Sequence, residues 1–362
     1  MTISNLPEYI DRGSEQVWRP PASATDIDLY GLVIPADDGA IDAMLAHDLN
    51  LPSGNAVDYR CANPNVIITF GSIGHEASSD PVDSGRGFIS ENEVSVWCLA
   101  ADMNASGRLV WYLPYIFTDS QQTVSTGREI FGYPKQLGYF DAGYPAALDD
   151  AGGVTTVSGL AIDPFGPASP ATKREMLSVT RQPGAAAVLG APSLFGALGA
   201  VVPGGVSVNL SIPSGPGSAP SATITASGSV PPAIPQAATP WIKGFVNAFK
   251  APKGLLDSDS LILDMVKNTT LVFLKQFRDI TCPTKACYQA VVEAPITFHL
   301  TGLGYQQLDP SVFALTVQSW ASDPIAAQLG IAPRTPIAPA SAFQAKLGFE
   351  IGLGLEIWRA PT

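Results

Sequence analysis

The chain has 362 residues, which is enough for one elaborated β domain or two ordinary domains. Hydrophobic residues make up 46% of it and charged residues 14%, a composition that can build a large core and excludes a disordered chain. The formal net charge of -12 excludes nucleic acid and anionic membrane surfaces as partners, because binding them needs clustered Lys and Arg side chains.

The first sixteen residues lack a basic segment followed by an apolar one, so we expect no secretory signal and a cytoplasmic protein. Four cysteines are present, and the pair in CPTKAC is separated by four residues, whereas redox and zinc motifs usually have two. The three histidines are isolated from one another along the chain. We therefore expect no metal site.

The N-terminal part predicts a strand, a helix and then closely spaced strands. Residues 26–37 predict the first strand, and residues 37–52 predict a helix that begins at Asp37 or Asp38. The residues on one face of this helix are apolar: Ile41, Met44, Leu45 and Leu49. Val, Ile, Trp and Tyr are concentrated in four further segments, with Gly, Pro and Asn between them, and we expect strands there, at residues 65–73, 92–101, 108–118 and 152–162. This density indicates a mainly β protein built on an antiparallel sheet or barrel.

A change of composition follows. No charged residue occurs from residue 182 to residue 242, and Ala, Gly, Pro and Ser dominate. We expect a single domain over residues 1–362 that carries an insertion at residues 182–260, ending in short helices. The insertion could be a partly ordered linker, or a lid or oligomer contact over a site. Its Gly and Pro content and the lack of basic flanks disfavour a membrane span.

The C-terminal part predicts a return to strands. Residues 240–268 predict two short amphipathic helices, the second capped near Asp257 to Asp259. Strands are expected at residues 270–277, 288–303 and 313–321. Residues 342–358 alternate apolar side chains with Glu and Gly, which predicts one long half-buried strand that closes the sheet.

The candidate functional residue is Lys135, within STGREIFGYPKQLGYF at residues 125–140. It could be an ordinary turn lysine, or an amine held in an apolar pocket for covalent chemistry. An unperturbed lysine has a pKa of about 10.4, so only about one molecule in 2,500 carries a free amine at pH 7. Covalent chemistry therefore requires apolar surroundings or a neighbouring cation that lowers the pKa and keeps the amine uncharged. Residues close to Lys135 in the sequence supply the apolar surroundings: Phe131, Tyr133, Leu137, Tyr139 and Phe140.

The segment GREIFGYPKQLGY resembles the signature of the acetoacetate decarboxylase superfamily, in which Gly-Arg-Glu precedes an aromatic residue and Pro-Lys. The resemblance extends over about residues 26–180 and 265–358. It implies an α+β, mainly β fold, a cone-like antiparallel barrel with peripheral helices, and a homo-oligomer. By the same resemblance Lys135 forms a Schiff base with a keto acid, and no metal or organic cofactor is needed.

Three functions remain open on this resemblance. The first is a lyase that decarboxylates a β-keto acid such as acetoacetate through the lysine imine. The second is an aldolase-dehydratase or cyclase that uses the same lysine on a larger keto acid. The third is a non-catalytic protein that binds a small molecule on the same fold.

The chain departs from the family pattern directly after the lysine. Gln136 occupies the position where the family usually has a second lysine, so the neighbouring cation has to come from Arg128 or from a distant lysine. The Gln136 amide could instead bind a carboxylate or hydroxyl of the substrate. Tyr133 is expected in the pocket wall, where it would bind substrate or tune the lysine.

The expected acid lies about forty residues before the lysine. Glu91 and Glu93 precede Lys135 by 44 and 42 residues, and Glu93 is preferred because it adjoins the predicted strand. A second glutamate of the family is expected near Thr69 and an early arginine near Asp26, and neither is present at these positions.

Overall fold

The structure is a computed structural model, and it describes residues 6–12, 17–183, 206–211, 221–226 and 269–361. Strands dominate these residues. They are β1 (Ala22–Pro35), β2 (Tyr59–Ser78), β3 (Ile89–Asp102), β4 (Arg108–Thr118), β5 (Lys135–Leu137), β6 (Tyr139–Phe140), β7 (Val154–Ala161), β8 (Thr172–Arg181), β9 (Val206–Ser211), β10 (Ser221–Ala226), β11 (Thr269–Arg278), β12 (Ala286–Leu308), β13 (Phe313–Val317), β14 (Ser341–Ile351) and β15 (Leu355–Arg359). The helices are α1 (Asp38–Leu45), α2 (Gln121–Thr126) and α6 (Ile325–Gln328), with short helical turns η2 (Ala46–Asn50), η3 (Met103–Ala105), η4 (Gly127–Phe131), η5 (Ala146–Asp149) and η7 (Pro310–Val312).

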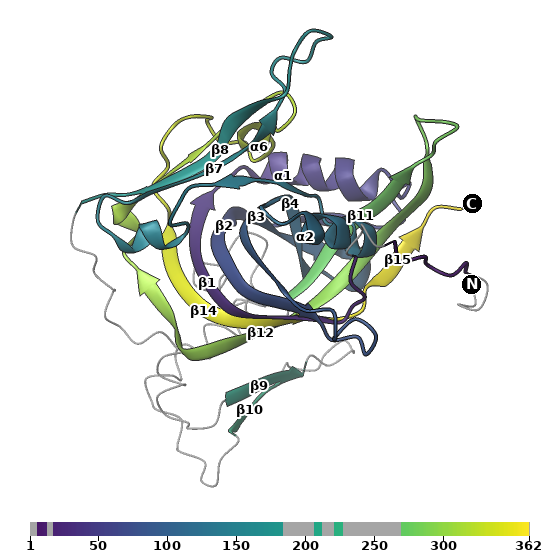
Figure 1. The fold of residues 1–362 in the computed structure, drawn as a ribbon, viewed down its shortest axis with the longest axis horizontal. Coiled ribbons are helices and arrows are strands. Elements are labelled where there is room, and N and C mark those ends of the chain that lie inside the picture. The colour runs from purple at the N-terminus through teal and green to yellow at the C-terminus, as the bar shows by residue number, and fades with distance from the viewer. Residues whose placement is uncertain (1–5, 13–16, 184–205, 212–220, 227–268, 362) are drawn as a thin grey trace.

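The long strands form a barrel. Their order is β11, β12, β14, β1, β2, β3, β4 and β5, and β11 also pairs with β4 at Leu271 and Trp111, which closes the path. Figure 1 shows these strands curving around a central space. The mainly β, α+β prediction is confirmed. The barrel is not antiparallel throughout, because β11 and β5 both run parallel to β4.

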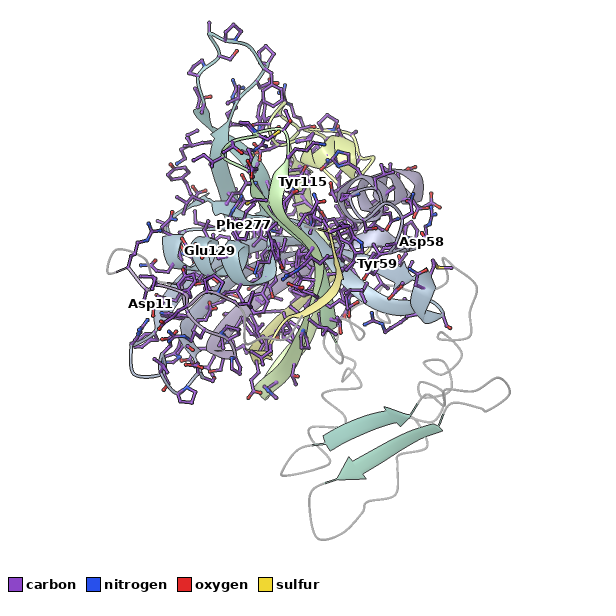
Figure 2. All side chains as sticks on the ribbon, turned by 90° about the vertical axis from the view of Figure 1, so that its right-hand side faces the viewer. Asp11, Asp58, Tyr59, Tyr115, Glu129 and Phe277 are labelled. Atoms are coloured by element: carbon purple, nitrogen blue, oxygen red, sulfur yellow. The ribbon has the colours of Figure 1, made fainter. Side chains whose placement is uncertain are left out.

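The barrel wall is covered on its outer side as well. Residues 66–70 of β2 and 94–100 of β3 are buried without alternation, as expected for strands that have protein on both faces. Part of the outer covering comes from α1, which contacts β2. A second sheet has the order β13, β8, β7 and β6, and Gly159 of β7 lies beside Phe117 of β4. Tyr115 of β4, labelled in Figure 2, connects the barrel to α6, since its hydroxyl donates to the side chain of Gln328.

The first helix begins as predicted. Asp37 caps α1 by accepting a hydrogen bond from the Ala40 amide, and this satisfies one of the free amides of the first turn. The apolar face is buried as expected, at Ile41, Met44, Leu45 and Leu49. The strands predicted around it, and those predicted at residues 152–162 and 270–321, are also present.

The prediction of one long C-terminal strand is wrong. β14 ends at Ile351, and β15 begins at Leu355 and pairs with β12. Leu353 and Leu355 are 66% and 61% exposed. The alternating pattern continues across the break, but glycines at 352 and 354 let the backbone leave the sheet.

Most of the predicted insertion, and both predicted helices at residues 240–268, lie outside the described residues. Within it the structure describes β9 and β10, which pair antiparallel. The single-domain organisation stays a prediction.

The segment before Lys135 is a helix and not only a turn. α2 continues into η4, and Gly132 then takes a left-handed conformation with φ 75° before β5 begins. A Cβ atom at Gly132 would lie 2.6 Å from the Lys275 Cα of β11. This glycine therefore lets the chain pass close to β11 and turn Lys135 into the barrel.

We expect Gly132→Ala to lower the free energy of unfolding by about 3 kcal/mol, because it combines left-handed strain with a clash against β11. Gly143→Ala is the matched control, since Gly143 has φ 84° and a Cβ atom added there would have no other heavy atom within 4 Å. It should cost about 1 kcal/mol. Urea unfolding of both variants measures the difference, and equal losses would show that the approach to β11 carries no cost.

Candidate active site

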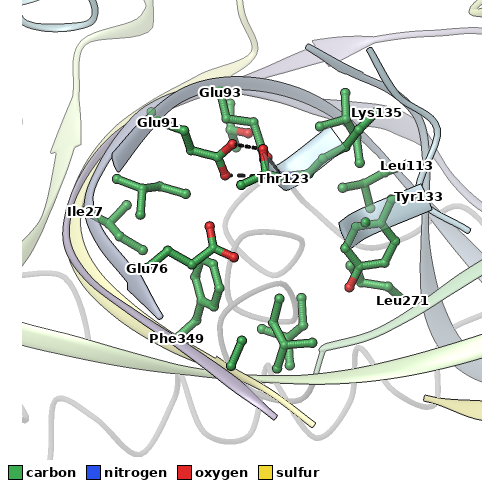
Figure 3. Close-up of a pocket in the computed structure, with 18 of the residues that line it drawn as sticks. Ile27, Glu76, Glu91, Glu93, Leu113, Thr123, Tyr133, Lys135, Leu271 and Phe349 are labelled. Carbon is green, nitrogen blue, oxygen red and sulfur yellow. Dashed lines mark hydrogen bonds and ion pairs between the residues drawn. The ribbon is translucent and has the colours of Figure 1, made fainter. Parts of the chain in front are cut away.

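The barrel encloses a cavity of about 100 Å³. Its walls are mainly apolar, and they include Leu29, Trp97, Leu113, Phe298 and Phe349. Polar groups gather on one side, where carboxylates and a lysine face one another (Figure 3). A single water needs about 10–15 Å³ on the same measure, so the cavity has room for a small organic molecule.

Lys135 lies in this cavity because β5 pairs with β4 and places Lys135 opposite Ile116. Side chains alternate along a strand, so Lys135 points inward and Gln136 points to the other face. Lys135 is 7% exposed. The structure therefore places the amine in an enclosed apolar pocket, not on a surface turn.

Glu91 and Glu93 lie two residues apart on β3, so both face the cavity. The Lys135 Nζ is 3.2 Å from Glu91 Oε1 and 2.7 Å from Glu93 Oε2. The sequence analysis favoured Glu93 over Glu91 as the acid of the site, and in the structure both carboxylates contact the lysine. The hydroxyls of Thr118 and Thr123 donate to Glu91 Oε2, which fixes this buried carboxylate.

A third carboxyl group, that of Glu76 on β2, lines the same cavity and was missed by the sequence analysis. β2 pairs with β3 at Ile73 and Glu91 and again at Glu76 and Ile89, so β2 has one extra residue between these pairs. Such a bulge shifts the side-chain alternation by one residue and turns Glu76 inward. Thr69, near which the second glutamate of the family was expected, also lines the cavity, so Glu76 is an additional carboxyl group on the same strand.

The charge state of Lys135 differs from the expectation. Burial lowers its pKa, but the negative charges of Glu91, Glu93 and Glu76 raise it by more, so the pKa lies above its ordinary value. The prediction of an amine kept uncharged by apolar surroundings is thus wrong for this pocket. Glu91 and Glu93 were expected as acids, but their effect on the pKa of Lys135, and the presence of Glu76, were not.

The pKa values of Glu76 and Glu91 lie above the ordinary value of a glutamate. Burial raises the pKa of Glu76 to about 8, and the charge of Glu91 adds to this effect. Burial also raises the pKa of Glu91, although Lys135 opposes the shift. At neutral pH Glu76 is mostly a neutral acid. The cluster therefore combines an ammonium ion, carboxylates and a carboxylic acid.

Tyr133 forms part of the cavity wall, as expected. It is buried, and its ring lies against Phe131 and Phe273, with centroid distances of 5.1 Å and 4.5 Å. Burial raises its pKa above the ordinary value, so the hydroxyl is protonated. The hydroxyl is buried without a hydrogen-bond partner among the described residues.

Two predicted site residues do not line the cavity. Arg128 is exposed, and its Nη1 donates to the Lys135 carbonyl oxygen at 3.3 Å, so it supports the turn instead of facing the amine. Gln136 points away from the cavity, and its Nε2 donates to Asp323 Oδ1 at 3.1 Å. Asp26, where the family arginine was expected, is exposed at an irregular point of β1.

Among the described residues, no group of three or more His, Cys, Asp or Glu side chains is arranged to hold a metal ion. In the same ranges no helix is long and apolar enough to cross a membrane.

A closed β-barrel with an enclosed lysine and carboxylate cluster defines a protein with an interior small-molecule pocket. Its fold is that of acetoacetate decarboxylase. The enzyme from Legionella pneumophila subsp. pneumophila str. Philadelphia 1 has 11% identity over 99% of this chain and 94% of its own, with a TM-score of 0.53. Another acetoacetate decarboxylase structure has 13% identity over 100% of both chains and a TM-score of 0.51. No protein-family model and no curated protein matches the chain. The likeness shows the fold predicted from the motif.

We expect Glu76 to make the free energy of unfolding fall as the pH rises from about 5 to about 8. The folded chain holds the Glu76 proton up to about pH 8, whereas the unfolded chain releases it near 4.5, so the folded state binds more protons in this window. Compared with Glu76→Gln, the unmodified protein should lose about 2 kcal/mol across it, which is less than the full linkage because the side chain is partly open to solvent. Urea unfolding at several pH values measures this.

Glu8→Gln, which neutralises an exposed carboxylate, is the control for this comparison. Its unfolding free energy should follow that of the unmodified protein at every pH. If the unfolding free energy of Glu76→Gln also follows that of the unmodified protein, the folded chain does not hold the Glu76 proton more tightly than the unfolded chain does.

Proposed function

We propose that the chain is a carbon–carbon lyase that forms a Schiff base between Lys135 and a small carbonyl compound. The observation that carries this proposal is the position of the Lys135 Nζ, enclosed in an apolar cavity and in contact with Glu91 and Glu93. Imine formation needs an amine, a nearby proton acceptor and a place from which water can be excluded. The likeness to acetoacetate decarboxylase supports the same class of chemistry.

The amine has to lose a proton before it can attack a carbonyl carbon. Its nearest acceptor is Glu93, whose Oε2 is 2.7 Å from Nζ. Transfer along this contact converts an ammonium–carboxylate pair into a neutral amine and a neutral acid. A bound carbonyl compound fills the cavity with apolar atoms, and removal of water favours uncharged groups over charged ones.

The neutral amine then adds to the carbonyl carbon, and loss of water, with the proton taken back from Glu93, gives a protonated imine. The positive nitrogen draws electrons from the neighbouring C–C bond, which breaks with loss of carbon dioxide from a β-keto acid or of an aldehyde from a β-hydroxy ketone. Either reaction leaves an enamine. A proton returned to its carbon and hydrolysis by water release the product and restore Lys135.

The carboxyl groups have separate tasks in this scheme. Glu93 exchanges the lysine proton. Glu91 is held by the hydroxyls of Thr118 and Thr123, so it balances the positive charge on nitrogen in both the ammonium ion and the imine. Glu76 carries a proton at neutral pH and can donate it to an oxygen of the bound compound.

The proposed imine can be trapped. The protein is incubated with acetoacetate, with pyruvate and with uncharged ketones, borohydride is added, and peptides are examined by mass spectrometry. We expect a reduced adduct on Lys135 with at least one compound. Lys135→Met should remove it, and Lys346→Met, which removes an exposed lysine on β14, should leave it unchanged.

Two results would overturn the proposal. One is the absence of any adduct with the whole panel, which would favour the non-catalytic binding protein. The other is labelling spread evenly over the exposed lysines. Where Lys135 is labelled, release of carbon dioxide separates decarboxylation from aldol-type cleavage.

Glu93→Gln tests the proton transfer. Removal of this negative charge should lower the pKa of Lys135, because one of the charges that stabilise the ammonium ion is lost. We expect the rise of the trapping rate with pH to shift toward lower pH by about 2 pH units. The rate is followed with a ketone that labels Lys135, from about pH 6 to pH 10. A profile that stays in place would show that Glu93 does not hold the proton of this amine.

A further inference from the structure

The cavity has more acidic than basic side chains, which disfavours the binding of an organic acid. Three carboxyl side chains line it, those of Glu76, Glu91 and Glu93. Among its lining residues in the described part of the chain, Lys135 is the single basic one. The proposed chemistry uses this lysine on the carbonyl group of the substrate, so no second cation there is left for a substrate carboxylate.

The two carboxylates nearest the lysine already share its charge. Glu91 and Glu93 lie within 3.2 Å and 2.7 Å of the same Nζ, which leaves the pair and the lysine with one net negative charge. The protonated imine has the same charge as the ammonium ion, so this balance persists through the reaction. An anion about 6 Å from that net charge would bind about 100-fold more weakly than a neutral compound, or ~2.8 kcal/mol at an effective dielectric near 20.

The cavity also has two polar atoms that need partners. Glu76 Oε2 and the Tyr133 hydroxyl oxygen are buried and have no hydrogen-bond partner among the described residues. Figure 3 shows them on different sides of the cavity, and both groups point into it. Burial without a partner costs free energy, so a bound molecule that meets both atoms gains from the contact. Hydroxyl and carbonyl oxygens can meet them without adding charge.

We propose that the pocket selects uncharged carbonyl compounds with a second neutral oxygen, such as β-hydroxy ketones, and that the reaction is retro-aldol cleavage instead of decarboxylation. This inference rests on the proposed imine chemistry of Lys135. The amine condenses with the ketone and releases water. A carboxylate then removes the hydroxyl proton, the C–C bond breaks, an aldehyde leaves, and the electron pair gives an enamine. Protonation at carbon and hydrolysis return a ketone and the free lysine, so no oxidant or reductant is consumed.

The charge selection is tested with 4-oxopentanoate and its methyl ester, which share one ketone and differ in charge. Borohydride trapping on the unmodified protein gives a rate for each compound. Each rate is divided by the rate of the same compound with free Nα-acetyl-lysine, whose side-chain amine is the reference. We expect the ester to label Lys135 about 100-fold faster. Equal rates, or faster labelling by the acid, would overturn the inference but leave the imine chemistry of Lys135 intact. Failure of both compounds and of the whole panel above to label Lys135 would overturn the proposed function and this inference with it.

The cleavage is tested with 4-hydroxypentan-2-one, whose retro-aldol products are acetone and acetaldehyde. We expect both products by proton NMR in equal amounts with the unmodified protein, and neither above background with Lys135→Met. Lys346→Met is the matched control and should retain the activity. If acetoacetate releases carbon dioxide faster than the hydroxy ketone is cleaved, the selection for uncharged compounds is wrong.

Discussion

The contact of one ammonium group with two carboxylates inside a closed barrel is the interaction on which the site depends. Burial of each charge alone would be costly, and removal of one member of a buried pair commonly costs about 3–5 kcal/mol. Lys135 on β5 therefore requires Glu91 and Glu93 on β3, and both require β4, which lies between these strands in the sheet. The two threonine hydroxyls on Glu91 complete the arrangement by satisfying its second oxygen.

The mainly β class was predictable from segments rich in Val, Ile, Trp and Tyr, and the barrel was predicted through the motif. The location of the lysine was predictable from a short motif. Gln136 faces away from the cavity because it follows Lys135 on β5 and side chains alternate along a strand. No strand was predicted at these positions, so the orientation of Gln136 came from the structure.

Other features could not be predicted from the sequence, since they depend on register. Glu76 enters the cavity because of a bulge after Ile73, and no local pattern marks where that extra residue is accommodated. The raised pKa of Lys135 has the same origin, because its causes lie on strands some forty to sixty residues earlier. The end of β14 at Ile351 was hidden by an apolar alternation that continues into exposed positions.

Apolar surroundings alone do not decide whether a buried lysine is charged. A neighbouring cation lowers the pKa of a lysine and releases its proton to solvent before a substrate arrives. Carboxylates act in the opposite way, because they keep the ammonium ion and also accept its proton at short range. In the proposed reaction the enamine carbon needs a proton after the C–C bond has broken. The carboxylate that accepts the hydroxyl proton when the C–C bond breaks lies in the same cavity and can return that proton to the carbon, so the carboxylates that delay the first step supply the last one.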